Sequence, residues 1–281
     1  MSHATAAAVD RARHFYWRLH RDLMRLRWRW RPEESVVCAS GNRLFLDTRD
    51  ARAFALWLSR GDVNPPSLAL WRLLLGLRPW SVVVDVGANH GEMLLNAALP
   101  AGARVFAFEP NPALTPFLRR SLAATALDAT VIEAAVGDAE GEIALFVDPR
   151  WSGNSTAVAA KASPGAAARR VPLVTLAGFL TQGDPPALPG ALLLKIDVEG
   201  HEIAVLRGLL PGLALCTDLA IMTEVHRMEP AELDWLAAHF DLALMTPAGR
   251  LRRATPAEAA AQDGLDAVLF RKGEAARFGV A

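Results

Sequence analysis

The sequence predicts an α/β fold built on a doubly wound, mostly parallel sheet. From Ser81 onward, short apolar runs typical of buried strands alternate with helical segments, which follow the first, second, fourth and fifth strands. The chain has 281 residues, of which 52% are hydrophobic, enough for one large domain with an appendage or for two small domains. The strand candidates are 82–86, 104–108, 130–136, 192–196, 219–225, 242–245 and 267–271.

The first 34 residues predict a basic amphipathic helix that ends near Pro32. Apolar side chains recur at helical spacing, and arginines form a stripe on another face. Such a helix can lie on an anionic membrane, contact a partner or cover an active site, but it more often packs its apolar stripe on the domain behind it. The apolar residues are Phe15, Leu19, Leu23, Leu26 and Trp30, and the arginines are Arg18, Arg21, Arg25 and Arg29.

Residues 35–80 predict a leading segment ahead of the main domain, which spans residues 81–281. Ser-Gly-Asn suits a tight turn between two apolar runs, and a serine after Pro-Pro suits the N-cap of a helix. The predicted elements are a hairpin turning at 40–42, a helix over 51–60 closed by Gly61, and a helix capped by Ser67 that runs to about Leu77.

Charge, cysteine content and hydropathy exclude several classes of function. The 30 basic and 30 acidic residues balance, so no overall field draws the protein to nucleic acid. Cys38 and Cys216 lack C-x-x-C spacing, which argues against a zinc site and a disulfide framework. No apolar run reaches the roughly 18 residues of a transmembrane helix, and the N-terminus lacks the apolar core of a secretory signal, so a cytoplasmic protein is expected. Residues 151–170, small and polar, predict a mobile loop or a weak helix.

Acidic residues follow three of the predicted strands, at the edge where open parallel sheets bind ligands. Asp85 precedes Gly87 and Gly91, whose G-x-x-x-G spacing is not the G-x-G-x-x-G of dinucleotide sites. A carboxylate there suits a cationic group, such as an ammonium or a sulfonium. Glu109 can accept both hydroxyls of a ribose, and Asp138 an exocyclic adenine amine. Together these groups describe S-adenosylmethionine, although each acid alone is often a solvated residue or a helix cap.

Six stretches of the sequence together resemble the FkbM-type methyltransferases, over Ser81 to about His226: VVVDVGANHG, FAFEPNP, AAVGDAEGEIAL, VPLVTLAGFL, LLLKIDVEGHEIAVLRG and IMTEVH. The resemblance implies a Rossmann-like class I methyltransferase fold, with a seven-stranded sheet whose last strand is antiparallel. It also implies S-adenosylmethionine as the cofactor. The cofactor-binding residues would then be Asp85, Gly87, Ala88, Asn89, Gly91, Glu109, Pro110 and Asp138.

A second group of polar residues follows the fourth and fifth strands and suits the chemistry of methyl transfer. Asp197 ends an apolar strand, and His201 follows at the start of a helix. Glu224 and His226 end the neighbouring strand. Transfer to oxygen needs an oriented nucleophile and a base, a role that suits a histidine with its ordinary pKa near 6.5. These four residues are therefore the catalytic candidates.

The same residues have other interpretations. Asp197, Glu224 and His226 can instead hold a divalent cation, but no spacing demands one, so a metal is possible and not expected. Glu199 and Glu202 can simply favour the dipole of the helix that follows them, and His201 can be structural.

The favoured function is O-methylation of a hydroxyl on a sugar, glycoconjugate or secondary metabolite. The expected partners are a small-molecule or glycan acceptor and no nucleic acid. An NAD(P)-dependent oxidoreductase is disfavoured by the glycine spacing. A non-catalytic adapter that acts through the arginine-rich helix is disfavoured because every acid that the cofactor would need is present.

Overall fold

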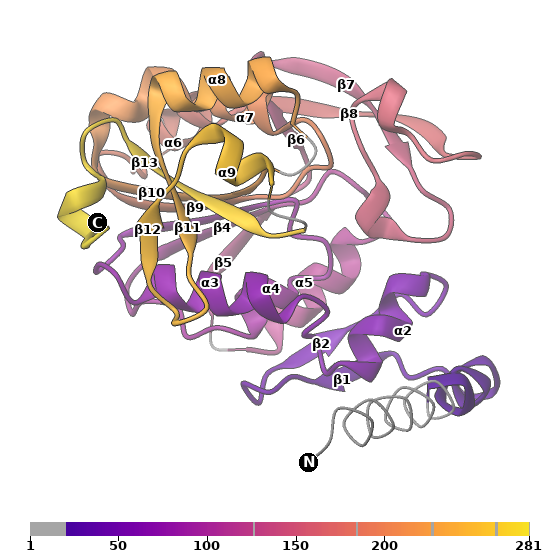
Figure 1. Cartoon of the computed structure of the whole chain (residues 1–281). Helices are drawn as coiled ribbons and strands as arrows, with labels where there is room; N and C mark the ends of the chain where they lie inside the picture. Colours follow the sequence, from indigo (N-terminus) through magenta and orange to yellow (C-terminus); the bar gives the residue numbers. More distant parts are fainter. Residues whose placement is uncertain (1–20, 126, 184, 226–227, 262–263, 281) are drawn as a thin grey trace, which may run out of the picture.

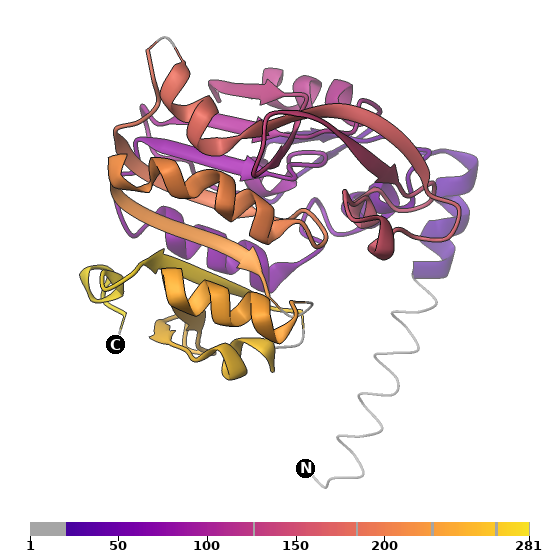
Figure 2. The same ribbon diagram turned by 90° about the horizontal axis from the view of Figure 1, so that it is seen from above.

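The structure is a computed structural model that describes residues 21–281 except 126, 184, 226–227, 262–263 and 281. A large twisted sheet runs through the middle of the molecule, with helices on both faces (Figure 1). The helix over residues 21–30 lies at the periphery beside α2 (Ala51–Leu58), away from the main sheet (Figures 1 and 2).

The main sheet has the order β12-β11-β13-β10-β9-β3-β4-β5. The strands β10, β9, β3, β4 and β5 pair in parallel, and β13 pairs antiparallel with both β10 and β11. This is the predicted Rossmann-like sheet with its last strand antiparallel, extended by one short edge strand, β12. The strands are β3 Val82–Val86, β4 Arg104–Phe108, β5 Ala129–Ile132, β9 Gly190–Ile196, β10 Cys216–Glu224, β11 Phe240–Met245, β12 Leu251–Arg253 and β13 Asp266–Arg271.

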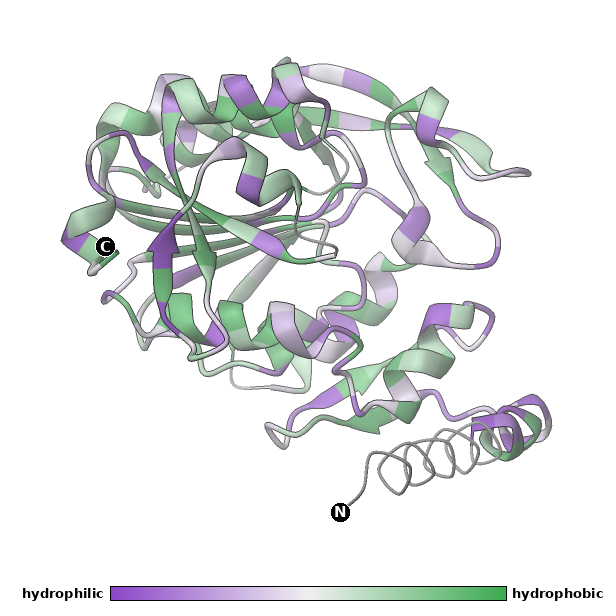
Figure 3. Ribbon diagram, in the orientation of Figure 1, coloured by the Kyte–Doolittle hydropathy of each residue, from purple (hydrophilic) through white to green (hydrophobic). Residues whose placement is uncertain are grey.

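Helices cover both faces of this sheet because its central strands are apolar on both sides. Successive residues of β3 point to opposite faces, so that Val83 joins one hydrophobic core and Val82 and Val84 join the other. Figure 3 shows the central strands mostly in the hydrophobic colour. The first core packs against α3 Pro65–Leu75, α4 Glu92–Leu95 and α5 Thr115–Ala123; the second packs against α6 Leu176–Gln182, α7 Glu202–Leu209, α8 Pro230–His239 and α9 Pro256–Ala260.

A separate three-stranded sheet, with the order β6-β8-β7, lies beside the main one. The predicted strand 130–136 is divided between the two sheets. β5 of the main sheet ends at Ile132, and residues 135 and 136 belong to β6 of the second sheet. The prediction of a loop or weak helix over 151–170 is wrong at its end, because residues 167–170 pair antiparallel with β7. The elements are β6 Ala135–Gly137, β7 Gly141–Val147, η1 Ser152–Asn154, η2 Ala159–Lys161 and β8 Ala167–Thr175, and η3 Leu210–Leu215 and η4 Ala275–Phe278 lie elsewhere.

The leading segment contains the predicted hairpin and both helices. β1 Ser35–Val37 and β2 Arg43–Phe45 pair antiparallel around Gly41, and α2 Ala51–Leu58 follows. The N-cap of α3 is Asn64, whose side chain accepts the Ser67 backbone N–H, so Ser67 is not the cap. The two prolines begin this helix, because the first turn needs no intrahelical N–H donors.

The described part of the N-terminal helix covers residues 21–30. Its predicted apolar stripe does not pack on the domain there, because Leu23, Leu26 and Trp30 are exposed, and Trp28 is buried instead. Phe15, Arg18 and Leu19 lie outside the described residues. Within the described ranges, no helix combines the length and the apolar character needed to span a membrane.

Candidate active site

A cavity of about 790 Å³ opens at the carboxyl ends of β3, β4, β9 and β10. The strand order reverses between β3 and β9, which is where open α/β sheets bind ligands. The other walls come from α2, from residues 59–68 that follow it, and from residues 151–157 after β7. A cavity of this volume can hold a nucleotide-sized ligand together with a second small molecule.

The glycine loop after β3 forms one wall of the cavity. Gly87, Ala88 and Asn89 line it, whereas Gly91 does not. A Cβ atom on Gly87 would lie 1.9 Å from the carbonyl oxygen of Asp197, so this glycine allows β3 and β9 to end side by side. Gly91 has a φ of +90°, and a Cβ atom there would meet the Leu118 side chain. The structure therefore gives Gly91 a packing role against α5.

Glu109 lies at the end of β4 with its carboxylate held by the glycine loop. One oxygen accepts the backbone N–H of Asn89 and the other that of Asn111, both at 2.8 Å. Glu109 and Pro110 both line the cavity. Burial raises the pKa of Glu109 to about 7, against the lowering effect of its two backbone hydrogen bonds. Each carboxylate oxygen keeps a lone pair for a further donor, so the geometry suits a pair of hydroxyls.

Asp85 does not face the cavity. Its side chain is fully buried, and its Oδ1 accepts a hydrogen bond from Lys195 Nζ at 3.0 Å. Lys195 lines the cavity and also lies 3.5 Å from Asp197 Oδ2. Burial lowers the pKa of Lys195, but the carboxylates of Asp85 and Asp197 outweigh burial and raise it. Asp85 lies on the same face of the sheet as Lys195, its register partner on β9, so its buried carboxylate positions the Lys195 ammonium that reaches the cavity.

Asp138 also lies outside the cavity wall, and its side chain is exposed. The prediction assumed that the third strand of the main sheet runs to Val136, but that strand ends at Ile132. Asp138 therefore follows a strand of the second sheet. The acid that directly follows β5 is Glu133, which is exposed and forms an ion pair with Arg119 at 3.0 Å. Neither acid lines the cavity.

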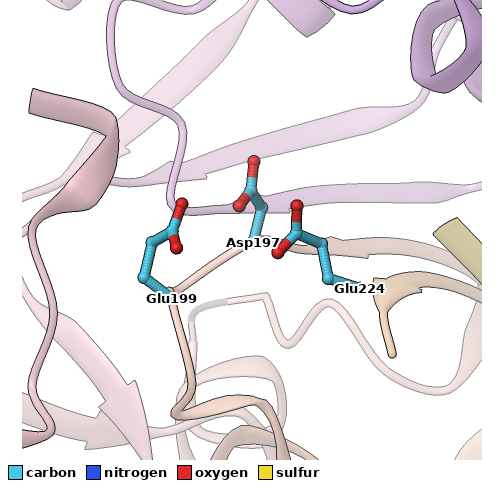
Figure 4. A group of neighbouring side chains, drawn as sticks. All are labelled: Asp197, Glu199 and Glu224. Atoms are coloured by element: carbon cyan, nitrogen blue, oxygen red, sulfur yellow. The ribbon is translucent and has the colours of Figure 1, made fainter. Parts of the chain in front are cut away.

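Three carboxylates meet at the ends of β9 and β10. Asp197, Glu199 and Glu224 each offer an oxygen, and these oxygens lie within 4.8 Å of one another; Figure 4 shows the side chains converging. Burial and the carboxylates of Asp197 and Glu199 raise the pKa of Glu224 to about 8. A set of oxygens like this is one that a divalent cation can occupy. Sequence reasoning named two of the three and treated Glu199 as a residue favouring the helix dipole.

The two predicted histidines differ in what the structure shows. His201 precedes α7 and lines the cavity. Its Nε2 atom is buried without a hydrogen-bond partner among the described residues, and burial lowers its pKa. A neutral ring at this place can accept a proton. His226 lies outside the described residues.

Sequence reasoning missed Arg52, which reaches the cavity from α2. Its guanidinium forms an ion pair with Glu92, the first residue of α4, and its Nε atom is buried without a partner among the described residues. Burial raises the pKa of Glu92, but Arg52 and His90 outweigh burial and hold it below its ordinary value. No local sequence pattern links Arg52 to Glu92. The one hint in the sequence was Glu92 itself, an acid that directly follows the glycine loop and has apolar neighbours typical of a buried turn.

The first turn of α2 is fastened to the loop at residues 150–154. Asp50, the N-cap of α2, accepts the backbone N–H groups of Arg52 at 3.0 Å and Ser152 at 3.1 Å. The backbone N–H of Ala51 donates to the carbonyl oxygen of Arg150 at 2.9 Å. Two walls of the cavity that are about a hundred residues apart in sequence are thus held together by one cap.

Comparison with known proteins gives a family match over most of the region that forms the site. The model of the methyltransferase FkbM domain family matches residues 85–245. A curated protein called Methyltransferase 1, from Beauveria bassiana strain ARSEF 2860, is 30% identical over 148 residues, which is 46% of this chain and 58% of that protein. The chain thus matches less than two thirds of the relative's length.

Solved structures give more distant likenesses. The precorrin-6y C5,15-methyltransferase from Geobacter metallireducens GS-15 is 14% identical with a TM-score of 0.39, over 75% of this chain and 88% of that one. The plantazolicin methyltransferase BpumL in complex with SAH is 11% identical with a TM-score of 0.41, over 80% of this chain and 90% of that one. Likenesses this weak do not bear on what the site does.

Proposed function

Because this chain belongs to the FkbM methyltransferase family, we propose that it transfers the methyl group of S-adenosylmethionine to a hydroxyl of a sugar, glycoconjugate or secondary metabolite. One observation carries the proposal. A single cavity joins the loop of Ala88 and Asn89 with Glu109 on one side to the carboxylates of Asp197 and Glu224 on the other. The first side is suited to a nucleoside, and the second is suited to an acceptor hydroxyl whose proton is removed by a carboxylate.

The cofactor half is built from residues whose hydrogen-bonding capacity is only partly used. Glu109 accepts the ribose hydroxyls through the lone pairs that its two backbone donors leave open. Arg52 lines the cavity and would face the carboxylate of the methionine part, while Glu92 neutralises part of the charge of its guanidinium. When bound, the cofactor supplies a methyl group on a positively charged sulfur.

The acceptor half provides orientation and a base. Lys195 holds Asp197 in place, and Asp197 would orient the acceptor beside Glu224. With the cofactor bound, its methyl group would pass to the acceptor oxygen with S-adenosylhomocysteine as the leaving group, and Glu224 would take up the proton of that hydroxyl. With a pKa raised to about 8, Glu224 is mostly protonated at neutral pH, and its charged form, which is a stronger base than an ordinary glutamate, becomes more abundant as pH rises toward 8. His201 and His226 are the other candidates for the base.

We propose that the carboxylate cluster works without a metal. The ammonium of Lys195 is already 3.5 Å from Asp197 and supplies positive charge next to the cluster. A divalent cation bound by Asp197, Glu199 and Glu224 would have to lie close to this ammonium, against their mutual repulsion. EDTA should therefore leave turnover unchanged. Inhibition by EDTA that Mg²⁺ or Mn²⁺ reverses would replace the base with metal-assisted deprotonation.

The proposal is tested by binding first and turnover second. S-adenosylhomocysteine at about 100 times its dissociation constant should stabilise the fold by about 2.7 kcal/mol, whereas NAD and NADP should not. Glu109→Gln should weaken S-adenosylhomocysteine binding at least tenfold, about the loss of one charged hydrogen bond. Glu133→Gln, at the exposed end of the neighbouring strand, should not change it. Tighter binding of NAD than of S-adenosylhomocysteine would replace the methyltransferase with an oxidoreductase.

A further inference from the structure

The N-terminal helix is attached to the leading segment by one side. Trp28 is 8% exposed, and its ring lies 5.8 Å from that of Phe54 and 5.4 Å from that of Trp57, both on α2. The guanidinium of Arg25 lies over Phe54 and that of Arg27 over Trp57. These aromatic contacts fix the helix and so determine which of its sides faces outward.

The outward side carries three large apolar residues. Leu23 is 54% exposed, Leu26 is 58% exposed and Trp30 is 83% exposed. At 100° per residue, their spacing places all three within about 60° of one another on the helix. They form a continuous apolar strip beside the arginines of the same helix, and we call this surface, residues 21–31, the helix surface. Figure 3 shows the ribbon of this helix alternating between the hydrophobic and hydrophilic colours.

Charge is strongly divided between residues 11–31 and the rest of the chain. Eight of the 30 basic residues lie within residues 11–31, but Asp22 alone of the 30 acidic residues does. The remainder of the chain therefore carries 22 basic and 29 acidic residues. The balanced net charge hides a positive N-terminal segment and a negative remainder of the chain, and such an asymmetry points to an anionic partner for this segment.

We propose that the helix surface docks the protein onto an anionic lipid membrane. The apolar strip enters the interface between headgroups and acyl chains, with Trp30 at the level of the headgroups, while Arg29 and Arg31 contact lipid phosphates. A second copy of this chain is a poorer occupant, because it would bring two arginine-rich helices together. Nucleic acid satisfies the charge but leaves the leucines exposed.

Docking at this surface places the membrane beside the cavity. Arg21 and Arg25, on the same helix, both line the cavity. The protein would bind peripherally, because the described helices include none that could cross a membrane. Peripheral binding through arginines should be reversible and weakened by salt.

The test compares sedimentation of the full chain with two kinds of vesicle, one of phosphatidylcholine alone and one of phosphatidylcholine and phosphatidylglycerol in equal parts. We expect the bound fraction to be about tenfold higher or more on the anionic vesicles, and to fall strongly in high salt. Equal binding to both vesicles, or binding to neither, overturns the proposal.

Variants separate the apolar strip from the charge. The double variant Leu26→Ser with Trp30→Ser should lose vesicle binding, while Leu215→Ser, an exposed leucine at 41% on η3, should keep it. Arg29→Gln with Arg31→Gln should weaken binding to anionic vesicles, while Arg169→Gln with Arg250→Gln, at exposed positions elsewhere, should not. Because all these side chains are exposed, thermal unfolding should be unchanged in every variant.

A doubling of the mass in solution offers a distinct contradiction. If light scattering shows a dimer that Leu26→Ser with Trp30→Ser converts to a monomer, and vesicles do not bind the wild type, the helix surface is an interface between two copies. Retention of vesicle binding by that double variant would equally exclude the strip as the docking element.

Discussion

Acidification should weaken cofactor binding through Glu109. Burial raises the pKa of this carboxyl to about 7 in the free protein, so it is largely protonated at lower pH. The ribose hydroxyls donate to a carboxylate, and binding therefore requires the charged form and releases a proton. The folded, unliganded pKa is the one that is raised, so affinity should increase with pH up to about 7 and become constant above it.

The size of the effect follows from that pKa. If only the charged form binds, the affinity is divided by one plus the ratio of protonated to charged Glu109. Between about pH 7.5 and about pH 5.5 this predicts a loss of about 25-fold, or about 1.9 kcal/mol. Isothermal titration calorimetry with S-adenosylhomocysteine measures the affinity at each pH, and buffers of different ionisation enthalpy report the proton released.

A matched variant isolates Glu109 from other groups in the cavity. Asp266, with a pKa raised by burial to about 6, and Glu224 titrate in a similar range and are unchanged in Glu109→Gln. This variant should bind more weakly than the wild type at about pH 7.5 and should lose most of the pH dependence. If wild-type affinity does not change between the two pH values, or if the variant keeps the full dependence, Glu109 does not bind the ribose.

Four further predictions concern the cavity and the residues around it. Gly87→Ala should lower the free energy of unfolding in urea by about 3 kcal/mol or more, because the new Cβ atom would lie 1.9 Å from a backbone carbonyl oxygen. Gly91→Ala should lower it by only about 1–2 kcal/mol, because its Cβ atom would meet a leucine methyl that can move. Equal losses in the two variants would contradict this reasoning. Asp138→Asn should leave S-adenosylhomocysteine affinity within about twofold in calorimetry, and a tenfold loss would restore it as a ligand. Glu224→Gln should lower turnover by about 10²–10⁴ with cofactor affinity unchanged, and full turnover would move the base to another residue. Because the pKa of Glu224 is raised in the folded state, the wild type loses stability as pH rises from 4.5 to about 8. Glu224→Gln removes this loss. Its free energy of unfolding should therefore exceed that of the wild type by roughly 2 kcal/mol above about pH 8, after allowance for partial exposure, and should not exceed it near pH 4.5.

The sequence predicted the features that depend on local pattern. The apolar runs of β3, β4 and β9 are each followed by the residues that end a buried strand, so the sheet and the position of its ligand-binding edge could be inferred. Glu109 is at the predicted place for the same reason. The tight turn that Gly87 makes after β3 was also expected. That the carbonyl oxygen of Asp197 lies next to this glycine could not be inferred from the sequence.

Direction and long-range pairing were not predictable in this way. Asp85 was assigned to the ligand, but its carboxylate is buried and hydrogen-bonded to Lys195, a partner 110 residues away that only the fold brings next to it. Asp138 was assigned to the cofactor because it follows the apolar run 130–136, predicted as a single strand. In the structure this run contributes to two short strands, β5 and β6, that belong to different sheets. The contact of Arg52 with Glu92 joins residues 40 apart, and only the fold brings them together.

The shared cap at Asp50 has a consequence for how the cavity opens. The loop at 150–154 cannot swing away from the cavity without releasing its hydrogen bond to Asp50, and that release also loosens the first turn of α2, which carries Arg52. Opening of the loop and fraying of the helix are thus one cooperative event and not two independent ones. The amides of Arg52 and Ser152 should then exchange their hydrogens with solvent at a common rate, and a bound ligand that touches either wall should slow both together.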